Sequence, residues 1–226
     1  VGYLERDRDL ARALFGRLEM LFYAAASLPQ NVWNRMSAVA ATVRKKPLFF
    51  CTEWGSTETA PVLTNVHYPL EGPGNIGLPV PGIEIKFVPN EDKMEMRVRG
   101  ESIFESYLGD ESLTQDAFDE EGFYIIGDAG KLADPLRPNK GIVFDGRVSE
   151  EFKLSSGTWV YVGALRVAII DAFSPYIQDC VIAGMDRDYL TLMAFPTQEL
   201  LDLIEGEPIG NPALHPEVRS VMLERL

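Results

Sequence analysis

The sequence predicts an α/β fold that continues into a β-barrel-like subdomain and ends in a small α+β C-terminal lobe. Three patterns support this prediction. Helical spacing alternates with short apolar runs over residues 1–65, and apolar and polar residues then alternate over residues 66–146. Helical and strand patterns mix again from residue 147 to residue 226. These three segments are the predicted domain divisions.

The pattern over residues 1–65 predicts alternating helices and buried strands. Leu10, Leu14 and Phe15 have helical spacing, and residues 21–26 are an apolar run of strand length. Residues 27–30 have the spacing of a capping box and place a proline early in the following helix. The apolar face of that helix comprises Val32, Trp33, Met36, Val39, Ala40 and Val43. A second buried strand is expected over 48–52, and ligands of open α/β sheets collect at the carboxyl edge of such strands.

The second segment has the period of half-buried strands. Ile83, Ile85 and Phe87 alternate with polar residues, and so do the apolar residues over 94–98, with a hairpin loop expected over 89–93. Glycines and prolines over 72–82 mark the transition from the first segment, and their spacing is not that of a phosphate loop. After residue 147, strand patterns and a short amphipathic helix predict the small lobe.

Composition limits the class of partner. A chain of 226 residues with 46% hydrophobic and 24% charged residues can bury a sizeable core. Its net charge of −13 repels nucleic acid backbones and anionic lipid, and no apolar run approaches the roughly 20 residues that span a bilayer. Cys51 and Cys180 are predicted to be buried thiols, which fits a cytoplasmic location. Zinc is not expected, because His67 and His215 lack cysteine or histidine neighbours at ligand spacing.

The stretch Trp54-Gly55-Ser56-Thr57-Glu58-Thr59-Ala60 is the strongest functional signal. It places hydroxyls and one carboxylate directly after a predicted strand. An aromatic ring can stack a base, and a carboxylate with hydroxyls can handle phosphate oxygens and Mg²⁺. The structural alternative is a helix N-cap or turn, in which the same residue types are common.

Two later segments favour a functional site over a structural turn. Residues 105–130 end in Gly127-Asp128, and residues 144–157 contain Gly146-Arg147 followed by Glu150, Lys153 and Gly157. Together with the first stretch, these segments resemble the fifth to eighth motifs of the adenylate-forming superfamily, which includes acyl-CoA synthetases, luciferases and peptide-synthetase adenylation domains. The stretches 54–61 and 152–160 look most like feruloyl-CoA synthetases.

The resemblance implies a role for each matching residue. Glu58 is expected to hold Mg²⁺, and Thr57 and Thr59 to bond the α-phosphate or acyl region. Trp54 is expected to cover the adenine, with Gly55 and Ser56 in the same nucleotide-binding stretch. The ribose is assigned to Asp128 and Arg147, the hinge to Glu150, and the pantetheine side to Lys153 and Gly157. Ser106 and Ile126 depart from the motifs without removing a charged ligand.

The implied activity is ATP-dependent ligation of a carboxylic acid to coenzyme A through an acyl-adenylate. By resemblance the acid is aromatic or hydroxycinnamic, such as ferulate, with ATP or AMP, Mg²⁺ and CoA as co-substrates or cofactors. Two alternatives stay open: a non-catalytic nucleotide-binding relative, and an adenylation domain that serves a carrier protein. A plain structural domain is a third possibility, in which Trp54 is an ordinary core residue.

The sequence lacks two parts that the resemblance leads us to expect. It contains no Gly-rich, Ser/Thr-rich loop with a lysine, and no C-terminal lysine in the usual Gly-Lys or Lys-Gly setting. It also begins at Val1 and stops within a helical pattern. We therefore interpret the chain as a piece of a longer protein: residues 1–146 would be the C-terminal part of the large AMP-binding domain, and residues 147–226 a truncated small domain.

Overall fold

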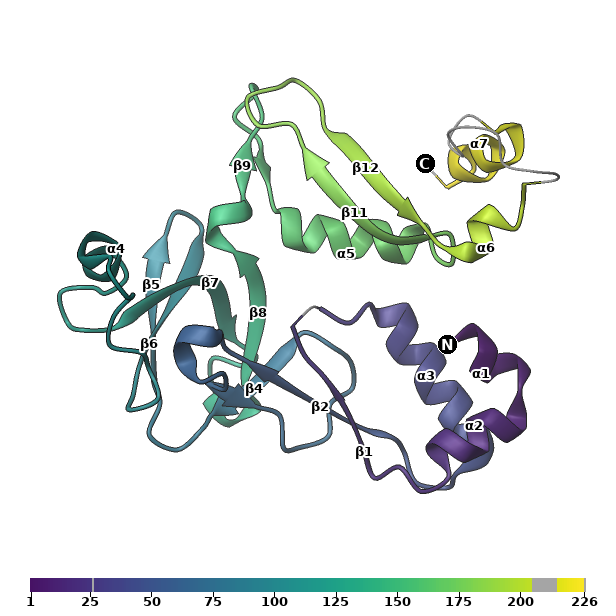
Figure 1. Cartoon of the computed structure of the whole chain (residues 1–226), viewed down its shortest axis with the longest axis horizontal. Coiled ribbons are helices and arrows are strands. Elements are labelled where there is room, and N and C mark those ends of the chain that lie inside the picture. Colours follow the sequence, from purple (N-terminus) through teal and green to yellow (C-terminus); the bar gives the residue numbers. More distant parts are fainter. Residues whose placement is uncertain (26, 205–214, 226) are drawn as a thin grey trace. The chain divides into compact units, whose positions relative to one another are not determined.

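A mixed eight-stranded sheet joins the predicted α/β and β-rich parts of the chain (Figure 1). The computed structural model describes residues 1–25, 27–204 and 215–225. The chain divides into two compact units, Val1–Ser149 and Glu150–Leu226, which we call unit 1 and unit 2.

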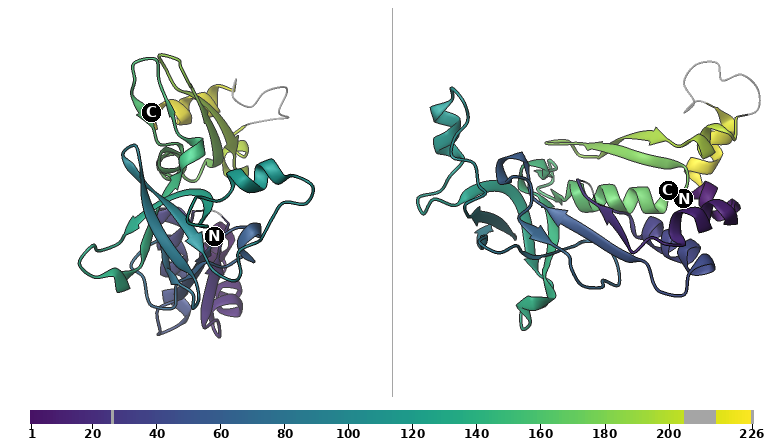
Figure 2. Two further views of the ribbon diagram at one scale, coloured as in Figure 1. Left: turned by 90° about the vertical axis from the view of Figure 1, so that its left-hand side faces the viewer. Right: turned by 60° about the horizontal axis from the view of Figure 1, so that its bottom comes forward.

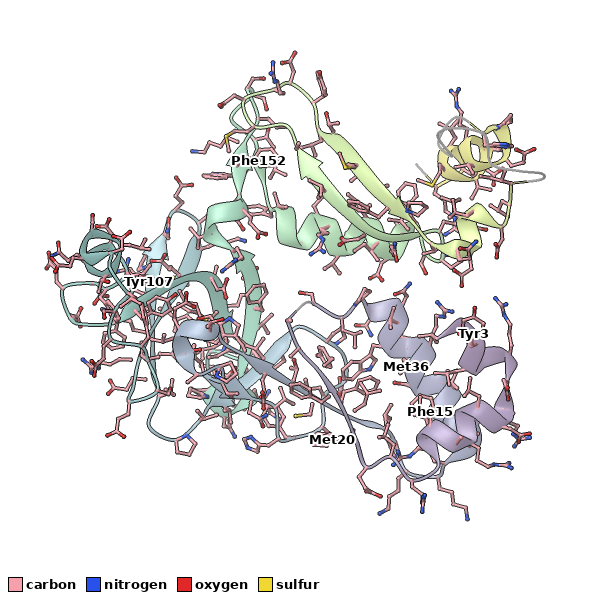
Figure 3. The ribbon with its side chains drawn as sticks, viewed as in Figure 1. Tyr3, Phe15, Met20, Met36, Tyr107 and Phe152 are labelled. Atoms are coloured by element: carbon pink, nitrogen blue, oxygen red, sulfur yellow. The ribbon has the colours of Figure 1, made fainter. Side chains whose placement is uncertain are left out.

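Unit 1 begins with helices packed beside two parallel strands. Its first elements are α1 (Gly2–Arg6), α2 (Arg8–Phe15), β1 (Met20–Tyr23), α3 (Gln30–Val43) and β2 (Phe49–Trp54), with β1 and β2 parallel. Asp7 caps α2, because its side chain accepts from the backbone N–H of Asp9 and of Leu10 at 2.9 Å each. Phe15 of α2 packs against α3 in a core cluster that Met36 also borders (Figure 3).

Two sequence-based expectations for this region need correction. Pro29 is the N-cap of α3 and provides no side-chain hydrogen bond, so the predicted capping box is wrong. Proline has no side-chain acceptor, and its extended ψ of 143° places it before the helix. The second strand also runs two residues past its predicted end, since Glu53 and Trp54 pair with Asn65 and Thr64.

The remaining strands of unit 1 extend the same sheet. They are β3 (Thr64–Asn65), β4 (Asn75–Pro79), β5 (Glu84–Asn90), β6 (Lys93–Arg99), β7 (Tyr124–Leu132) and β8 (Ile142–Arg147), with the helical segments η1 (Thr57–Thr59), α4 (Glu111–Asp116), η2 (Pro138–Lys140) and η3 (Val148–Glu150) between or after them. The strand order is β1-β2-β3-β4-β8-β7-β6-β5. The hairpin between β5 and β6 is tighter than predicted, because Asn90 and Lys93 already pair.

The sheet curls strongly over its middle strands. Three strands separate β2 from β7, and neighbouring strands lie about 4.8 Å apart, so a flat sheet would hold β2 and β7 about 19 Å apart. Trp54 of β2 nevertheless donates from Nε1 to Oδ2 of Asp128 on β7 over 2.7 Å. Inside the curl lies a core cluster that joins both halves of the sheet: Trp54, Leu63, Ile76, Met96, Val98, Tyr124, Ile126 and Ile142. The curl therefore brings residues far apart in the strand order into contact.

Unit 2 is a small α+β arrangement. Its elements are β9 (Phe152–Lys153), β10 (Trp159–Val160), α5 (Val162–Ala172), β11 (Ile177–Ala183), β12 (Thr191–Pro196), α6 (Gln198–Leu201) and α7 (Pro216–Leu223). Helix α5 runs along the antiparallel β11–β12 pair (Figure 2). Cys180 is buried in the core of this unit, as Cys51 is in unit 1, and both thiols are free, as predicted. Among the described residues, no helix has the length and apolarity needed to cross a bilayer.

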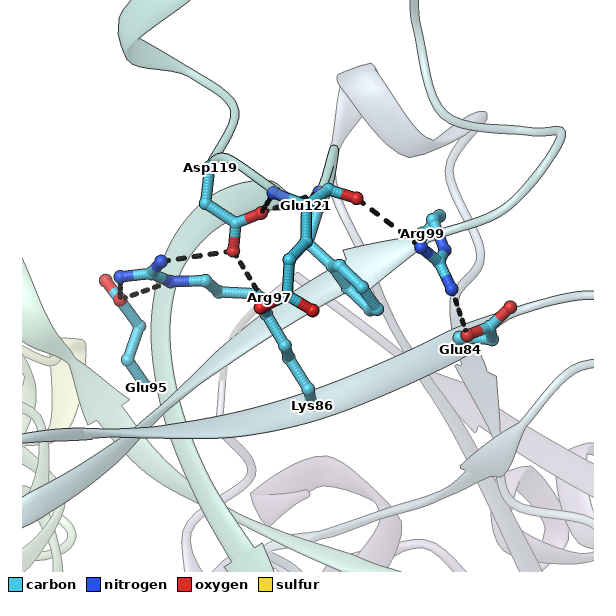
Figure 4. Close-up of polar contacts among 8 residues, drawn as sticks. Glu84, Lys86, Glu95, Arg97, Arg99, Asp119 and Glu121 are labelled. Carbon is cyan, nitrogen blue, oxygen red and sulfur yellow. Dashed lines mark hydrogen bonds and ion pairs between the residues drawn. The ribbon is translucent and has the colours of Figure 1, made fainter.

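An ionic network ties the turn before β7 to strands β5 and β6 (Figure 4). Asp119 is its centre: it lies 2.8 Å from Lys86 and 3.1 Å from Arg97, and its other oxygen accepts from the backbone N–H of Glu121 and of Phe123. Burial alone would raise the pKa of Asp119, but these donors hold the pKa well below its usual value. The network fixes the start of β7, the strand that carries Asp128.

We expect Asp119→Asn to destabilise unit 1 at neutral pH by about 1 to 3 kcal/mol, because the variant loses charge-assisted bonds to two cations. The folded-state pKa of Asp119 is lowered, so its contribution is complete above the unfolded pKa of about 4 and is lost as the pH falls through the folded-state pKa. The stability difference between the two proteins should therefore shrink below about pH 4. Urea unfolding at a series of pH values, followed by tryptophan fluorescence, measures it.

Glu121→Gln provides the matched control. Glu121 also pairs with Lys86, at 2.9 Å, but its side chain is 72% exposed, and an exposed ion pair contributes less than about 1 kcal/mol. An equal loss of stability in both variants would contradict a special role for Asp119.

Candidate functional site

The predicted nucleotide-binding stretch begins at the last residue of β2. Trp54 pairs with Thr64 of β3 and is only 7% exposed, because its ring belongs to the core inside the curled sheet. The indole N–H points to Asp128. A ring so deeply buried offers little surface on which a base could stack.

A tight loop follows Trp54 and depends on glycine. A Cβ built on Gly55 would lie 1.9 Å from the carbonyl oxygen of Pro61, so any side chain at position 55 would collide with backbone. Ala60 ends the short helix η1 in the left-handed region, with φ of 55°. Gly55 therefore allows the chain to fold back on itself, and the Thr57-Glu58 pair is presented between the two ends of the loop.

Thr59 has a structural role that corrects the expected phosphate contact. Its hydroxyl accepts from the backbone N–H of Ser56 at 2.8 Å and donates to the Ser56 carbonyl at 3.0 Å. The residue is completely buried. The Thr59 hydroxyl therefore holds the loop together. Because this hydroxyl is already hydrogen-bonded and no surface of Thr59 reaches solvent, we do not expect the side chain to contact a ligand. Thr57 beside it is exposed.

Glu58 is held as an ionised carboxylate. Its own backbone N–H, followed by Tyr107 and the charge of Arg147, holds the pKa of Glu58 below its usual value. Tyr107 donates from its hydroxyl to Oε1 of Glu58 at 3.0 Å. The carbonyl of Glu58 accepts from the N–H of Phe104 at 2.8 Å, which anchors the backbone at the same point.

Tyr107 is a site residue that sequence reasoning missed. It lies in the segment quoted for the sixth motif, but nothing in the spacing of that segment links it to position 58. Its ring packs 4.7 Å from that of Phe104, and its backbone N–H donates to Thr114 of α4. Burial and the Glu58 carboxylate raise the pKa of Tyr107, so the phenol keeps its proton and donates. Its place within the segment that resembles the sixth motif was the one available sequence signal.

Asp128 and Arg147 lie opposite each other on β7 and β8. Their register in the antiparallel pair places Nε of Arg147 3.1 Å from Oδ1 of Asp128, while Trp54 occupies Oδ2. The Asp128 side chain is 10% exposed and that of Arg147 is 53% exposed. The predicted convergence of Trp54, Asp128 and Arg147 is therefore confirmed, and the Arg147 charge also acts on Glu58.

The other predicted site residues belong to unit 2. Glu150, its first residue, is exposed. Lys153 lies with its ammonium 4.4 Å from the centre of the Trp159 ring, a cation–π contact. Gly157 turns the chain between β9 and β10 with φ of 81°, a conformation that favours glycine. These positions give no evidence on the pantetheine and hinge roles, which stay predictions.

Glu58 is the residue best suited to a metal in unit 1. Among the described residues, no group of three or more histidine, cysteine, aspartate or glutamate side chains could hold an ion. Mg²⁺ at nucleotide sites is commonly bound through one or two carboxylates together with phosphate oxygens and water. One ionised glutamate therefore fits a nucleotide-borne Mg²⁺ and does not fit a metal held by the protein alone.

Arg147 thus links two carboxylates with different surroundings, Asp128 by a hydrogen bond and Glu58 by its charge. Asp128 is nearly buried and has donors on both oxygens, which suits it to accept further bonds from neutral hydroxyls. Glu58 is more accessible and next to an exposed threonine and an arginine charge. The arrangement can bind a polar ligand that has a diol at one end and anionic oxygens with a cation at the other.

Comparison with known proteins finds similar sequences. Residues 4–108 match the AMP-binding enzyme family. The chain is 25% identical over 230 residues to a probable CoA ligase, CCL8, of Humulus lupulus, covering 94% of this chain and 35% of that protein. It is also 34% identical over 116 residues to a carboxylic acid reductase of Mycobacterium marinum, covering 51% of this chain and 9% of that protein.

A solved structure shares the fold. The A domain of carboxylic acid reductase from Segniliparus rugosus, in complex with AMP and a co-purified carboxylic acid, superposes with a TM-score of 0.66 at 22% identity. The match covers 96% of this chain and 33% of that one. The mixed α/β fold is thus that of adenylation domains of AMP-binding enzymes, and the chain spans about a third of the length of the CoA ligase it resembles.

We expect Tyr107→Phe to raise the pKa of Glu58 toward its ordinary value, because the variant loses one donor to the carboxylate and keeps the ring packing. Carbon-13 NMR of the glutamate side-chain carboxyl groups measures the titration. Tyr68→Phe is the control: it loses a phenol bonded to Asn75 and to the Lys140 carbonyl, also in unit 1. A shift of Glu58 in the control, or none in Tyr107→Phe, would contradict the assigned contact.

Proposed function

We propose that the full-length protein is an ATP-dependent carboxylate–CoA ligase, because residues 4–108 match the AMP-binding enzyme family. It would join a carboxylic acid to AMP with release of pyrophosphate, and then transfer the acyl group to the thiol of coenzyme A. The observation that supports this most is that Trp54 and Arg147 both donate to the Asp128 carboxylate. The charge of Arg147 also lowers the pKa of Glu58.

The adenosine end of the site is assigned to Asp128 and Arg147. Asp128 would accept the two ribose hydroxyls, since a carboxylate offers about four acceptor positions. Arg147, half exposed, would add a contact to the ribose. Trp54 completes this end of the site from the core side.

The phosphate end is assigned to Thr57 and Glu58. Adenylation gathers negative charge on the phosphate oxygens, and oriented donors and cations must offset it. Mg²⁺, when bound with the nucleotide, supplies that positive charge, and Glu58 is the residue that would hold it. The exposed Thr57 hydroxyl would donate to a phosphate or acyl oxygen, and Gly55 and Ser56 would shape the loop that presents both side chains.

The thiol-transfer step is assigned to residues of unit 2. Gly157, in its tight turn, would leave room for the pantetheine arm of CoA, because no side chain projects there. Lys153 lies on the strand that leads into this turn. A conformational change between the two half-reactions would occur through rotation of a few backbone torsions near Glu150, the residue at which unit 2 begins.

The finer assignments extend this proposal. The acid is proposed to be aromatic or hydroxycinnamic, such as ferulate, on the resemblance of residues 54–61 and 152–160. The strongly negative net charge argues against nucleic acid as a partner, and the two buried free thiols favour a cytoplasmic location.

Adenylation for a carrier protein is the second candidate. It is favoured by the likeness to carboxylic acid reductases, whose adenylation region this chain matches in sequence and in fold. A ligase would accept free CoA as the thiol, whereas a carrier-dependent enzyme would require a phosphopantetheinylated carrier domain. A non-catalytic relative would bind AMP and release no pyrophosphate with any acid.

In the full-length protein, we expect Asp128→Ala to lower kcat/KM for acid-dependent pyrophosphate release by about 10- to 100-fold, the effect of losing hydrogen bonds to a charged group. A panel of acids, with CoA present or absent, measures the rate and the thiol requirement together. Asp134→Ala is the control, because Asp134 is a partly buried aspartate of the same unit that also pairs with an arginine, Arg137. A wild-type protein that released no pyrophosphate with any acid would refute ligase function.

The chain of 226 residues by itself should have no turnover, since its sequence lacks the lysine-bearing phosphate loop and the C-terminal lysine setting. Incubation with ATP, CoA and ferulate is expected to yield pyrophosphate only at background level. Robust release from this chain alone would show that neither part is needed.

A further inference from the structure

We infer that the Tyr107 hydroxyl makes Glu58 a metal ligand through one oxygen only, and that the site thereby favours the Mg²⁺ complex of a nucleotide over its Ca²⁺ complex. Tyr107 is then a positioning residue, because it acts on the cation through Glu58. The inference rests on the proposed function, in which Glu58 holds the cation that arrives with ATP. It goes beyond that function by naming the residue that sets which cation is preferred.

The Tyr107 hydroxyl bonds one particular oxygen of the Glu58 carboxylate. It donates to Oε1 over 3.0 Å, and a tyrosine hydroxyl keeps its proton at neutral pH. A cation that approached both oxygens of Glu58 would compete with this proton for Oε1, whereas Oε2 is not in contact with Tyr107. The hydrogen bond therefore favours cation binding through Oε2 alone.

The phenol is held in place by contacts that also fix the backbone of Glu58. The backbone N–H of Tyr107 donates to the Thr114 hydroxyl over 3.0 Å, and its ring packs 4.7 Å from that of Phe104. Phe104 in turn donates its backbone N–H to the carbonyl of Glu58 over 2.8 Å. Glu58 is thus anchored at its carbonyl and at its carboxylate by the same segment. Turning the carboxylate to surround a larger ion would break the bond to Tyr107.

The two cations differ in what they require of a carboxylate. Mg²⁺ is small, needs near-octahedral geometry and keeps several waters, so one carboxylate oxygen beside the phosphate oxygens is sufficient. Ca²⁺ is larger, takes about six to eight oxygens and commonly uses both oxygens of a carboxylate. Among the described residues, no group of three or more acidic, histidine or cysteine side chains could surround an ion. Blocking Oε1 of Glu58 therefore disfavours Ca²⁺ more than Mg²⁺.

The test measures ATP binding to the full-length protein by isothermal titration calorimetry, with Mg²⁺ or Ca²⁺ in large excess and no acid present, so that no adenylate forms. The wild-type protein should bind the Mg²⁺ complex more tightly. Tyr107→Phe keeps the ring and removes the donor, so we expect the Ca²⁺ complex to bind about tenfold more tightly, the order of one hydrogen bond to a charged group. Affinity for the Mg²⁺ complex should change less than about threefold, which is small on the same scale.

Two further variants separate the hydrogen bond from packing. Site-specific Tyr107→4-aminophenylalanine keeps a neutral donor at the same ring position and should restore the preference for Mg²⁺. Tyr68→Phe is the matched control: Tyr68 is another half-buried tyrosine of unit 1, and its hydroxyl bonds Asn75 and the Lys140 carbonyl. This control should keep the wild-type preference.

Four results would overturn the inference: equal affinity of the wild-type protein for the two complexes, an unchanged preference in Tyr107→Phe, no restoration by 4-aminophenylalanine, or the same loss of preference in Tyr68→Phe. Failure of the proposed function gives different results. Equal ATP affinity with and without a divalent cation would refute the metal role of Glu58, and a wild-type protein that binds neither ATP nor AMP would refute the nucleotide site itself.

Discussion

A nearly buried carboxylate is the constraint on which the rest of unit 1 depends. Asp128 is 7% exposed, and burying an ionised group without donors is strongly unfavourable. Two donors reach it from other strands: Trp54 at the end of β2, with three strands between β2 and β7, and Arg147 at the end of the neighbouring β8. The sheet must curl for Trp54 to reach it, and the same curl encloses the hydrophobic core. The packing of the core and the hydrogen bonding of the buried Asp128 carboxylate therefore both require the same curl of the sheet.

The loop after β2 is arranged around the same point. Gly55 permits a close backbone approach, and Thr59 uses its hydroxyl to lock the ends of the loop. What stays accessible between them is Thr57 and the Glu58 carboxylate, which Tyr107 holds from a separate segment. The residues that resemble a nucleotide motif thus divide into two groups, those that build the loop and those that it presents.

The likeness to known enzymes and the local geometry address different questions. The match to AMP-binding enzymes and the shared adenylation-domain fold concern the scaffold. Ligases and carboxylic acid reductases are both among the similar proteins, so likeness leaves the thiol acceptor open. The ribose site proposed at Asp128 is compatible with either acceptor, because the contacts of Asp128 with Trp54 and Arg147 do not involve the thiol.

The sequence by itself determined the order and type of most elements and the residues that converge at Asp128. Hydrophobic period distinguished helix from strand at Phe15, Val39 and Ile85, and the motif spacing singled out Trp54, Asp128 and Arg147. Only the tertiary structure decided that Thr59 is locked inside the loop, that Tyr107 reaches Glu58, and that the Trp54 ring is turned into the core. The hydrophobic period and the spacing of the motifs depend only on local geometry along the chain. Burial and long-range hydrogen bonds depend on how far the whole sheet curls, which no short segment encodes.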